Sequence, residues 1–141
     1  MITKSILLPC PPERAFALFT DRISDWWPPE RRHTGDPGSV ITLANGQRFF
    51  ERDGAGREVD LGAVRAWDPP ARLELDWFPG TDPAHPTRVE VRFVPEGEGT
   101  RVLVHHGPAP GSEALFRQRA ARYEASWTLV LSALASALDE W

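Results

Sequence analysis

Four polar residues that could do chemistry fall at positions where the sequence is otherwise apolar. Glu51, Arg65 and His106 lie in stretches that alternate polar and apolar residues, and Tyr123 lies in a long C-terminal run with helical spacing. A carboxyl, an imidazole and a phenol can act as general acids or bases, or bind the polar end of an apolar molecule. Burying such a group without a partner costs roughly 1–3 kcal/mol, so their positions are informative.

A purely structural explanation of the same residues stays open. Glu51 and Arg65 could pair on neighbouring strands, or lie near an open end of a sheet in contact with water. The sequence therefore leaves two alternatives for each of the four: a contact with a ligand or a reacting group, or a structural pairing.

Metal binding and several common forms of catalysis find no support. His105 and His106 are adjacent on an expected strand, so their side chains point to opposite faces. His33, His85 and Cys10 lack the spacing of metal ligands. The sequence also contains no Gly-x-Ser-x-Gly elbow, phosphate loop or dinucleotide fingerprint. We expect neither a metal nor another cofactor, and the sequence alone does not identify the catalytic residues.

Composition predicts one cytoplasmic domain over residues 1–141. A chain of 141 residues that is 41% hydrophobic is long enough to bury one core. The N-terminus does not resemble a signal peptide, and no stretch reaches the roughly 20 apolar residues of a membrane span. The single cysteine, Cys10, fits a reducing compartment. A net charge of −4 argues against nucleic acid as a partner.

The residues from Ser112 to Trp141 predict one long amphipathic helix. At about 100° per residue, its apolar side chains fall on one stripe. The stripe comprises Phe116, Ala120, Tyr123, Trp127, Val130, Leu131, Leu134, Leu138 and Trp141. Such a stripe needs a curved sheet to cover, and the part from Tyr123 to Leu131 is expected to roof a cavity, with Leu134 to Trp141 packed in the core.

The rest of the chain predicts an antiparallel sheet. A strand at Thr3–Leu8 is followed by two short helices, at Pro12–Thr20 and Asp21–Trp27, and by a polar segment, Glu30–Ser39, that is either a lid or a solvated connection. Six further strands follow, with a hairpin signal at Asn45–Gly46: Val40–Leu43, Gln47–Arg52, Arg57–Trp67, Arg72–Phe78, Thr87–Val94 and Thr100–His106. Within Arg57–Trp67, alternation places Val59, Leu61, Ala63, Arg65 and Trp67 on one face. The order is that of an α+β domain whose sheet has the final helix as its cover.

These residues resemble a known family. The resemblance runs in order through Pro11-Pro12-Glu13-Arg14-Ala15-Phe16, Trp26-Trp27-Pro28, Arg48-Phe49-Phe50-Glu51, Gly62, Trp67-Asp68-Pro69-Pro70, Thr87-Arg88-Val89-Glu90-Val91 with Phe93, and Gly99-Thr100-Arg101-Val102. The set is similar to the Activator of Hsp90 ATPase homologue-like family, within the START-like SRPBCC superfamily of helix-grip proteins.

The resemblance implies a fold and a function. It implies a seven-stranded antiparallel sheet wrapped on the long C-terminal helix, with two short helices after the first strand. It also implies a cavity between sheet and helix for a small hydrophobic molecule such as a lipid or polyketide. A cyclase- or hydrolase-like enzyme using the same cavity, and a chaperone-associated interaction module, are the alternatives. Binding to a chaperone or to a second copy of the chain stays open.

Alternation and the resemblance together give the expected cavity lining, although a core filled by side chains would use the same residues. The expected ligand-binding residues are Trp26, Trp27, Phe49, Glu51, Arg65, Trp67, Trp77, Val91, Phe93, Val104, His106, Tyr123, Trp127 and Leu131.

Overall fold

The computed structural model describes residues 1–45 and 48–139. The elements are β1 (Ile2–Leu8), α1 (Pro12–Phe19), α2 (Ile23–Trp26), the 3-10 turn η1 (Pro29–Arg31), β2 (Val40–Thr42), β3 (Arg48–Arg52), β4 (Glu58–Asp68), β5 (Arg72–Trp77), β6 (Thr87–Glu96), β7 (Gly99–Pro108) and α3 (Glu113–Asp139). The predicted α+β order is confirmed. Part of the hairpin signal, Gly46, and the predicted last helical residue, Trp141, fall outside the described residues.

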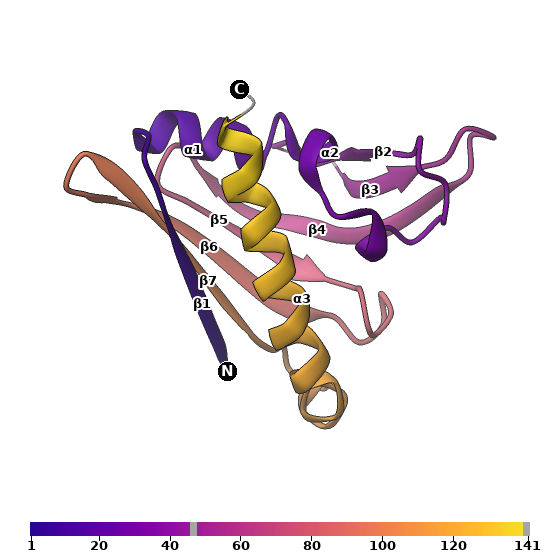
Figure 1. The fold of residues 1–141 in the computed structure, drawn as a ribbon. Coiled ribbons are helices and arrows are strands. Elements are labelled where there is room, and N and C mark those ends of the chain that lie inside the picture. The colour runs from indigo at the N-terminus through magenta and orange to yellow at the C-terminus, as the bar shows by residue number, and fades with distance from the viewer. Residues whose placement is uncertain (46–47, 140–141) are drawn as a thin grey trace.

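The seven strands form one antiparallel sheet, in the order β1-β7-β6-β5-β4-β3-β2. Helix α3 lies across its inner face, and α1 and α2 close one end (Figure 1). The predicted helix-grip architecture is therefore confirmed. Because the strands follow one another as a meander, the two ends of the sheet are β1 and the short β2, and the sheet curves around the helix.

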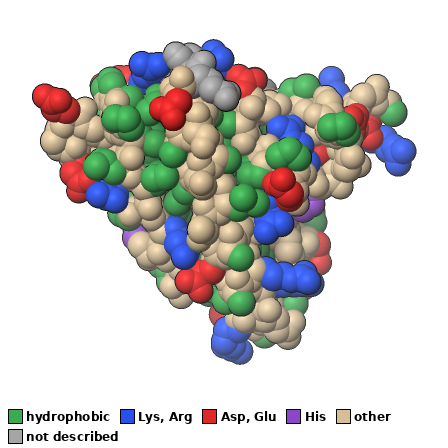
Figure 2. All heavy atoms as spheres, in the orientation of Figure 1, with side chains coloured by type: hydrophobic (Ala, Val, Ile, Leu, Met, Phe, Trp, Pro, Cys, Tyr) green, Lys and Arg blue, Asp and Glu red, His purple; other side chains and the backbone are tan. Residues whose placement is uncertain are grey.

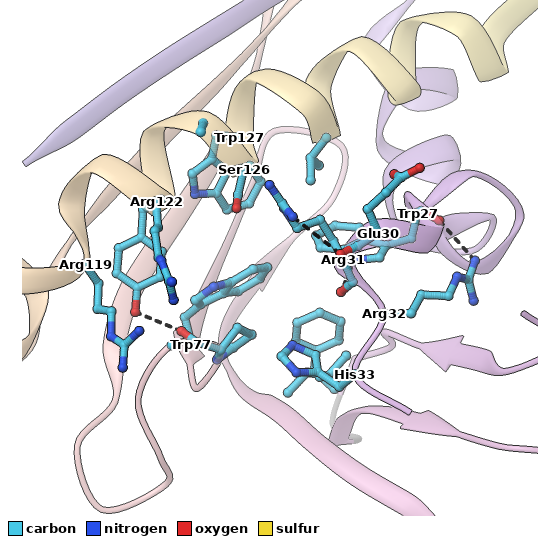
Figure 3. A pocket seen from close by; sticks show the side chains of 17 residues that line it. Trp27, Glu30, Arg31, Arg32, His33, Trp77, Arg119, Arg122, Ser126 and Trp127 are labelled. Carbon is cyan, nitrogen blue, oxygen red and sulfur yellow. Dashed lines mark hydrogen bonds between the residues drawn. The ribbon is translucent and has the colours of Figure 1, made fainter. Parts of the chain in front are cut away.

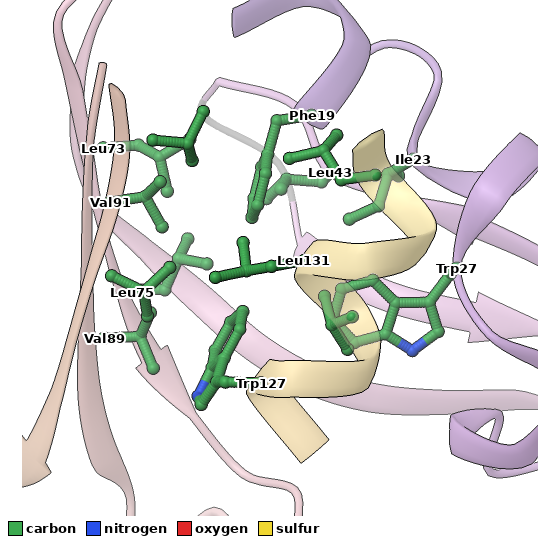
Figure 4. Packing of buried hydrophobic residues seen from close by; sticks show 14 of the residues in the cluster. Phe19, Ile23, Trp27, Leu43, Leu73, Leu75, Val89, Val91, Trp127 and Leu131 are labelled. Atoms are coloured by element: carbon green, nitrogen blue, oxygen red, sulfur yellow. The ribbon is translucent and has the colours of Figure 1, made fainter. Parts of the chain in front are cut away.

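The apolar stripe of α3 supplies the core. Its buried residues are Phe116, Tyr123, Trp127, Val130, Leu131, Leu134 and Leu138. Figure 4 shows Leu131 and Trp127 facing Leu75 and Val89 of the sheet. Phe19 of α1 packs edge-on against the Phe93 ring of β6, with centroids 5.9 Å apart, so the first helix covers one end of the same core.

Two irregularities in β4 correct the prediction for Arg65. The pairing between β3 and β4 shifts between Phe49 and Phe50, and the pairing between β4 and β5 shifts between Val64 and Ala66. Each β-bulge reverses the side-chain alternation that follows it. Val64 therefore pairs with buried Leu75 on the inner face, and Arg65 lies on the outer face, where it contacts Asp76 at 3.3 Å.

The second bulge restores the predicted direction further along β4. Trp67 pairs directly with Leu73 and packs against the core, as strict alternation had predicted. Ala63 pairs with Asp76, whose carboxylate contacts arginines of the outer face, so the prediction that Ala63 faces the helix is also wrong. Strict alternation thus holds at both ends of β4 and fails between the two bulges.

The outer face of the sheet is a network of ion pairs. Each arginine of the strands contacts at least one carboxylate within 4 Å: Arg48, Arg52, Arg65, Arg72, Arg88, Arg92 and Arg101. Exposed pairs of this kind contribute little each, about 0–1 kcal/mol, but they satisfy the charges of this face. None of the helices in the described part of the chain combines the length and hydrophobicity needed to span a bilayer.

Candidate functional site

A cavity of about 550 Å³ opens between α3, the inner face of β3–β5 and the segment that follows α2. Figure 3 shows the side chains around it. Its lining residues are Trp27, Glu30, Arg31, Arg32, His33, Phe49, Leu61, Trp77, Pro79, Gly80, Arg119, Arg122, Tyr123, Ala125, Ser126, Trp127 and Val130. This volume lies within the range of pockets that bind drug-sized molecules.

Aromatic rings form the apolar part of the lining. The Trp77 ring lies at the centre, with centroid distances of 5.2 Å to Trp127, 5.4 Å to Phe49 and 6.0 Å to Trp27. These four side chains are almost completely buried. They come from α3, β5, β3 and the end of α2, so the fold itself assembles them from distant parts of the chain.

Five of the expected ligand-binding residues line the cavity: Trp27, Phe49, Trp77, Tyr123 and Trp127. The structure places the others elsewhere. Four belong to the packed core around α3 and are buried: Val91, Phe93, Val104 and Leu131. The roof of the cavity begins at Arg119, about one helical turn before the expected Tyr123, and ends at Val130, one residue before the expected Leu131.

Trp26 and Trp67, the other two tryptophans of the expected ligand-binding set, serve the packing of α1. The Trp26 indole donates its N–H to the Leu18 carbonyl at 2.7 Å. The Trp67 ring packs edge-on against Phe16, with centroids 5.3 Å apart. Neither residue is among those that line the cavity. Arg65 is also remote from the cavity because its side chain lies on the outer face.

His106 lies behind the aromatic wall in a closed chain of hydrogen bonds. The Trp127 indole N–H donates to Nδ1 of His106 at 3.0 Å, so Nδ1 is the unprotonated nitrogen. Nε2 then carries the hydrogen and donates to the Thr87 hydroxyl at 2.8 Å, and that hydroxyl donates to the Trp77 carbonyl at 3.1 Å. Each polar side-chain atom of this hydrogen-bonded series has a partner. The series connects Trp127 of α3 to the backbone of Trp77 in β5.

Burial keeps this imidazole neutral. His106 has no exposed surface, and desolvation lowers its pKa from 6.5 to about 3. A second proton on Nδ1 would also face the Trp127 N–H, which is a donor. The side chain therefore positions the cavity wall and has no free nitrogen to offer a substrate.

Tyr123 lines the cavity with its hydroxyl already engaged. The hydroxyl donates to the Pro79 carbonyl at 2.8 Å, and the ring lies 4.2 Å from the His106 ring. Burial raises the pKa of the phenol above its ordinary value. The close approach of Gly80 allows this contact, since a Cβ on Gly80 would lie 2.7 Å from the phenol oxygen.

Glu51 fastens the polar segment that forms one wall. Its buried carboxylate accepts hydrogen bonds from the backbone N–H groups of His33 and Thr34, at 2.8 and 2.9 Å, and from the Thr34 hydroxyl. Burial alone would raise the pKa of this carboxyl, but the hydrogen bonds outweigh it and hold the pKa below its ordinary value. Glu51 is thus an ionised anchor for the wall.

Arg32 secures the same segment from the other side. Its guanidinium donates to the backbone carbonyls of Ser24 at 2.6 Å, Ser39 at 2.9 Å and Trp27 at 3.2 Å. Residues 30–33 are consequently held against the cavity. The polar segment is therefore a fastened wall of the cavity, which differs from both expected alternatives, a lid and a solvated connection.

Sequence reasoning missed the positive charges at the cavity. Helical spacing leaves Arg119 and Arg122 outside the apolar stripe of α3, which is typical of a solvated flank, yet both line the cavity together with Arg31. A signal was present: Arg119 precedes Tyr123 by four residues, and such residues are neighbours on a helix surface.

Within residues 1–45 and 48–139, no group of three or more His, Cys, Asp or Glu side chains could hold a metal ion. The lining contains one carboxylate, that of Glu30, and one imidazole, that of His33. This arrangement can enclose an apolar molecule among aromatic rings and offer guanidinium groups as hydrogen-bond donors to its polar end.

Comparisons with known proteins agree with the fold. The family described as "Activator of Hsp90 ATPase homolog 1-like protein" matches residues 9–139. The solution structure of CalC from Micromonospora echinospora, described as a self-sacrificing resistance protein, is similar with a TM-score of 0.76 and 27% identity over 99% of this chain and 94% of CalC. No curated protein matches the sequence.

Two crystal structures with lower identity show the same fold. Protein MLL2253 from Mesorhizobium loti gives a TM-score of 0.63 with 21% identity, over 99% of this chain and 98% of that protein. Protein NE0264 from Nitrosomonas europaea gives a TM-score of 0.68 with 15% identity, over 99% and 94%.

Proposed function

Because this chain belongs to the Activator of Hsp90 ATPase homolog 1-like family, a family of helix-grip domains, we propose that it binds a small hydrophobic molecule between the sheet and α3. The observation that carries the proposal is the cavity of about 550 Å³ walled by Trp27, Trp77 and Trp127. A concave, mostly apolar site with a few polar groups at its edge is the usual form of a small-molecule site.

The packing around the cavity supports binding by a largely preformed site. The hydrogen bonds from Trp127 through His106 to Thr87 fix the back wall. Those of Glu51 fix the side wall. A site whose walls are already ordered loses less conformational entropy when a ligand enters, which favours affinity. CalC is described as a self-sacrificing resistance protein, and ligand binding by this chain is compatible with a resistance role.

The enzyme alternative has less support from the same geometry. Its candidate acid and base groups were Glu51, His106 and Tyr123, and each is engaged by protein partners. Glu51 and His106 have no exposed surface and do not line the cavity.

The interaction-module alternative also has less support. Such a module would use an exposed sheet edge or the region of Trp26 and Trp27, and it predicts a filled cavity and an exposed apolar patch. Both tryptophans are buried. The exposed large hydrophobic side chains of the described residues are spread over separate elements: Met1, Leu7, Val40, Val59, Val94 and Leu129. Scattered single side chains are normal on a protein surface.

Native mass spectrometry of the protein purified from the cells that make it tests the proposal. We expect a co-purifying small molecule with the wild type, and none with Ser126→Trp, because an indole at this lining position fills the cavity. Gln118→Trp is the matched control, since it adds the same indole at an exposed position of α3 outside the lining. Finding no bound molecule in the wild type, or the same molecule in Ser126→Trp, contradicts the proposal.

A further inference from the structure

We infer that the ligand of this cavity carries an anionic group, such as a carboxylate, that binds between the arginines of α3 and Arg31 while its apolar body lies against the tryptophans. This inference rests on the proposed function and specifies its ligand. Three observations support it: the positions of Arg31, Arg119 and Arg122, their lack of a carboxylate partner among the described residues, and the paired arginines on the rest of the surface.

The cations lie on two sides of one opening. Arg119 and Arg122 come from successive turns of α3, and Arg31 and Arg32 come from the segment after α2 (Figure 3). Residues three apart on a helix lie on the same face, so both α3 arginines reach the cavity. Figure 2 shows positively charged side chains gathered beside α3 on this face of the molecule.

The arginines of the opening have no carboxylate partner among the described residues. Arg119 and Arg122 make no ion pair with any described residue, whereas every arginine of the strands contacts a carboxylate. Among the described residues, the guanidinium of Arg31 donates only to the backbone carbonyl of Glu30, at 3.4 Å. Arg32 is engaged by backbone carbonyls, so the donors available to a ligand are those of Arg119 and Arg122 and most of those of Arg31.

Nearby carboxylates are engaged elsewhere or point away from these donors. Asp82, in the loop after Gly80, contacts the His85 ring at 3.0 Å. Glu124 of α3 contacts Lys4 at 3.7 Å on the side of β1. Glu30 is the one acidic residue of the lining, and Figure 3 shows its carboxylate pointing away from Arg119 and Arg122.

The local charge is opposite to that of the whole chain. The lining holds four arginines and one glutamate, in a protein with a net charge of −4. Arginines that face one another without counter-ions repel, and a bound anion relieves that repulsion. A cleft with apolar walls also concentrates the field of its charges, which attracts anions to the opening.

The position of the charges relative to the rings indicates a ligand with an apolar part and an anionic part. Arg119 lies close enough to Tyr123 for its charge to offset part of the rise in the phenol pKa that burial causes. The charged opening is thus directly continuous with the aromatic wall. Guanidinium groups bind carboxylates through paired hydrogen bonds, so an apolar acid satisfies both parts of the site.

A matched pair of probes tests the inference. 1-Pyrenebutanoic acid and 1-pyrenebutanol share one apolar body and differ in the anionic group, and both are titrated by calorimetry at low ionic strength into the wild type and three variants. The first variant is Arg119→Gln/Arg122→Gln. The second, Arg117→Gln, is the matched control, because Arg117 is an exposed arginine of the same helix outside the lining. The third, Ser126→Trp, blocks the cavity.

We expect the acid to bind the wild type at least about tenfold more tightly than the alcohol, a ratio that corresponds to about 1.4 kcal/mol. The double variant removes that preference and leaves the Kd of the alcohol within about twofold, whereas Arg117→Gln preserves it. Raising the salt to 0.5 M weakens only the acid, because salt screens exposed charges. Dodecanoate, titrated alongside, distinguishes a lipid-derived acid from a ring-bearing one.

The outcomes separate this inference from the proposed function. If the wild type binds acid and alcohol with equal affinity and Ser126→Trp binds neither, the inference of an anionic ligand is wrong. The cavity would still be the binding site. The same loss in Arg117→Gln as in the double variant also overturns it, because net charge alone would then account for the preference. Binding that persists in Ser126→Trp, or binding of neither probe, overturns the proposed function as well.

Discussion

Lowering the pH should destabilise this protein through one residue, His106. The imidazole has no exposed surface, accepts from the Trp127 indole and donates to the Thr87 hydroxyl. In the unfolded chain the same side chain titrates near 6.5, whereas burial lowers its pKa in the folded state to about 3. Below pH 6.5 the unfolded state therefore binds a proton that the folded state does not.

The sign and size of the effect follow from this difference. Above pH 6.5 both states are neutral at His106 and the residue contributes no pH dependence. As the pH falls towards 3, the free energy of unfolding falls by up to about 1.4 kcal/mol per pH unit. Between pH 7 and pH 5 the loss amounts to about 2 kcal/mol. The carboxyl groups with lowered pKa, such as Glu51, add their losses mainly below pH 4.5.

Urea unfolding at pH 7, 6 and 5 measures the effect in the wild type, His106→Gln and His105→Gln. We expect His106→Gln to be less stable at pH 7 but nearly independent of pH over this range. His105→Gln is the matched control, because this neighbour contacts Thr3 on the opposite face of β7. A wild type that loses less than about 0.5 kcal/mol between pH 7 and pH 5, or an NMR titration of His106 near 6.5, would refute the reasoning.

Two substitutions test the fixed walls of the cavity. Glu51→Gln replaces a buried acceptor of three hydrogen bonds and should cost about 2–3 kcal/mol in urea unfolding, with faster amide exchange at residues 33–34. Glu96→Gln, at an exposed ion pair, should cost less than about 1 kcal/mol; equal losses would contradict the anchoring role. Gly80→Ala should cost more than Gly56→Ala, because both have positive φ near 85° but a Cβ at Gly80 also meets the phenol oxygen at 2.7 Å. Equal costs would show that the close approach is not restrictive.

The fold was predictable because each level of the sequence indicated the same answer. The stripe on α3 has helical spacing, and the strands alternate with short turns between them. Buried residues such as Trp77 and Val91 therefore fell on the expected face. At most of the strand ends, the predicted and observed bounds differ by one or two residues. There the pairing partner, rather than local propensity, decides which residue makes the last hydrogen bond.

Arg65 shows where sequence periodicity stops being informative. Alternation assigns a face only while the register is uninterrupted, and β4 is interrupted twice. Gly62 within the strand was the one local signal of an irregularity, since glycine in a strand often marks a bulge. The second bulge has no comparable signal, so the direction of Arg65 depends on pairing across the sheet.

The candidate site was predictable for its rings and less so for its charges. Trp77 and Phe49 are inward on alternating strands, which is a local property. Whether an arginine at the edge of the α3 stripe faces solvent or a cavity depends on how the segment after α2 folds back. That segment is held by Glu51 and Arg32 through backbone atoms, and backbone contacts leave no pattern in the sequence.

A crystal structure of the protein grown with 1-pyrenebutanoic acid tests the central claim most directly. The account predicts one bound molecule between α3 and β3–β5, with its rings against Trp77 and Trp127 and its carboxylate towards Arg119 and Arg122. A molecule bound only at the outer face of the sheet, or an unliganded cavity filled by the rings of Trp27 and Trp77, would contradict it.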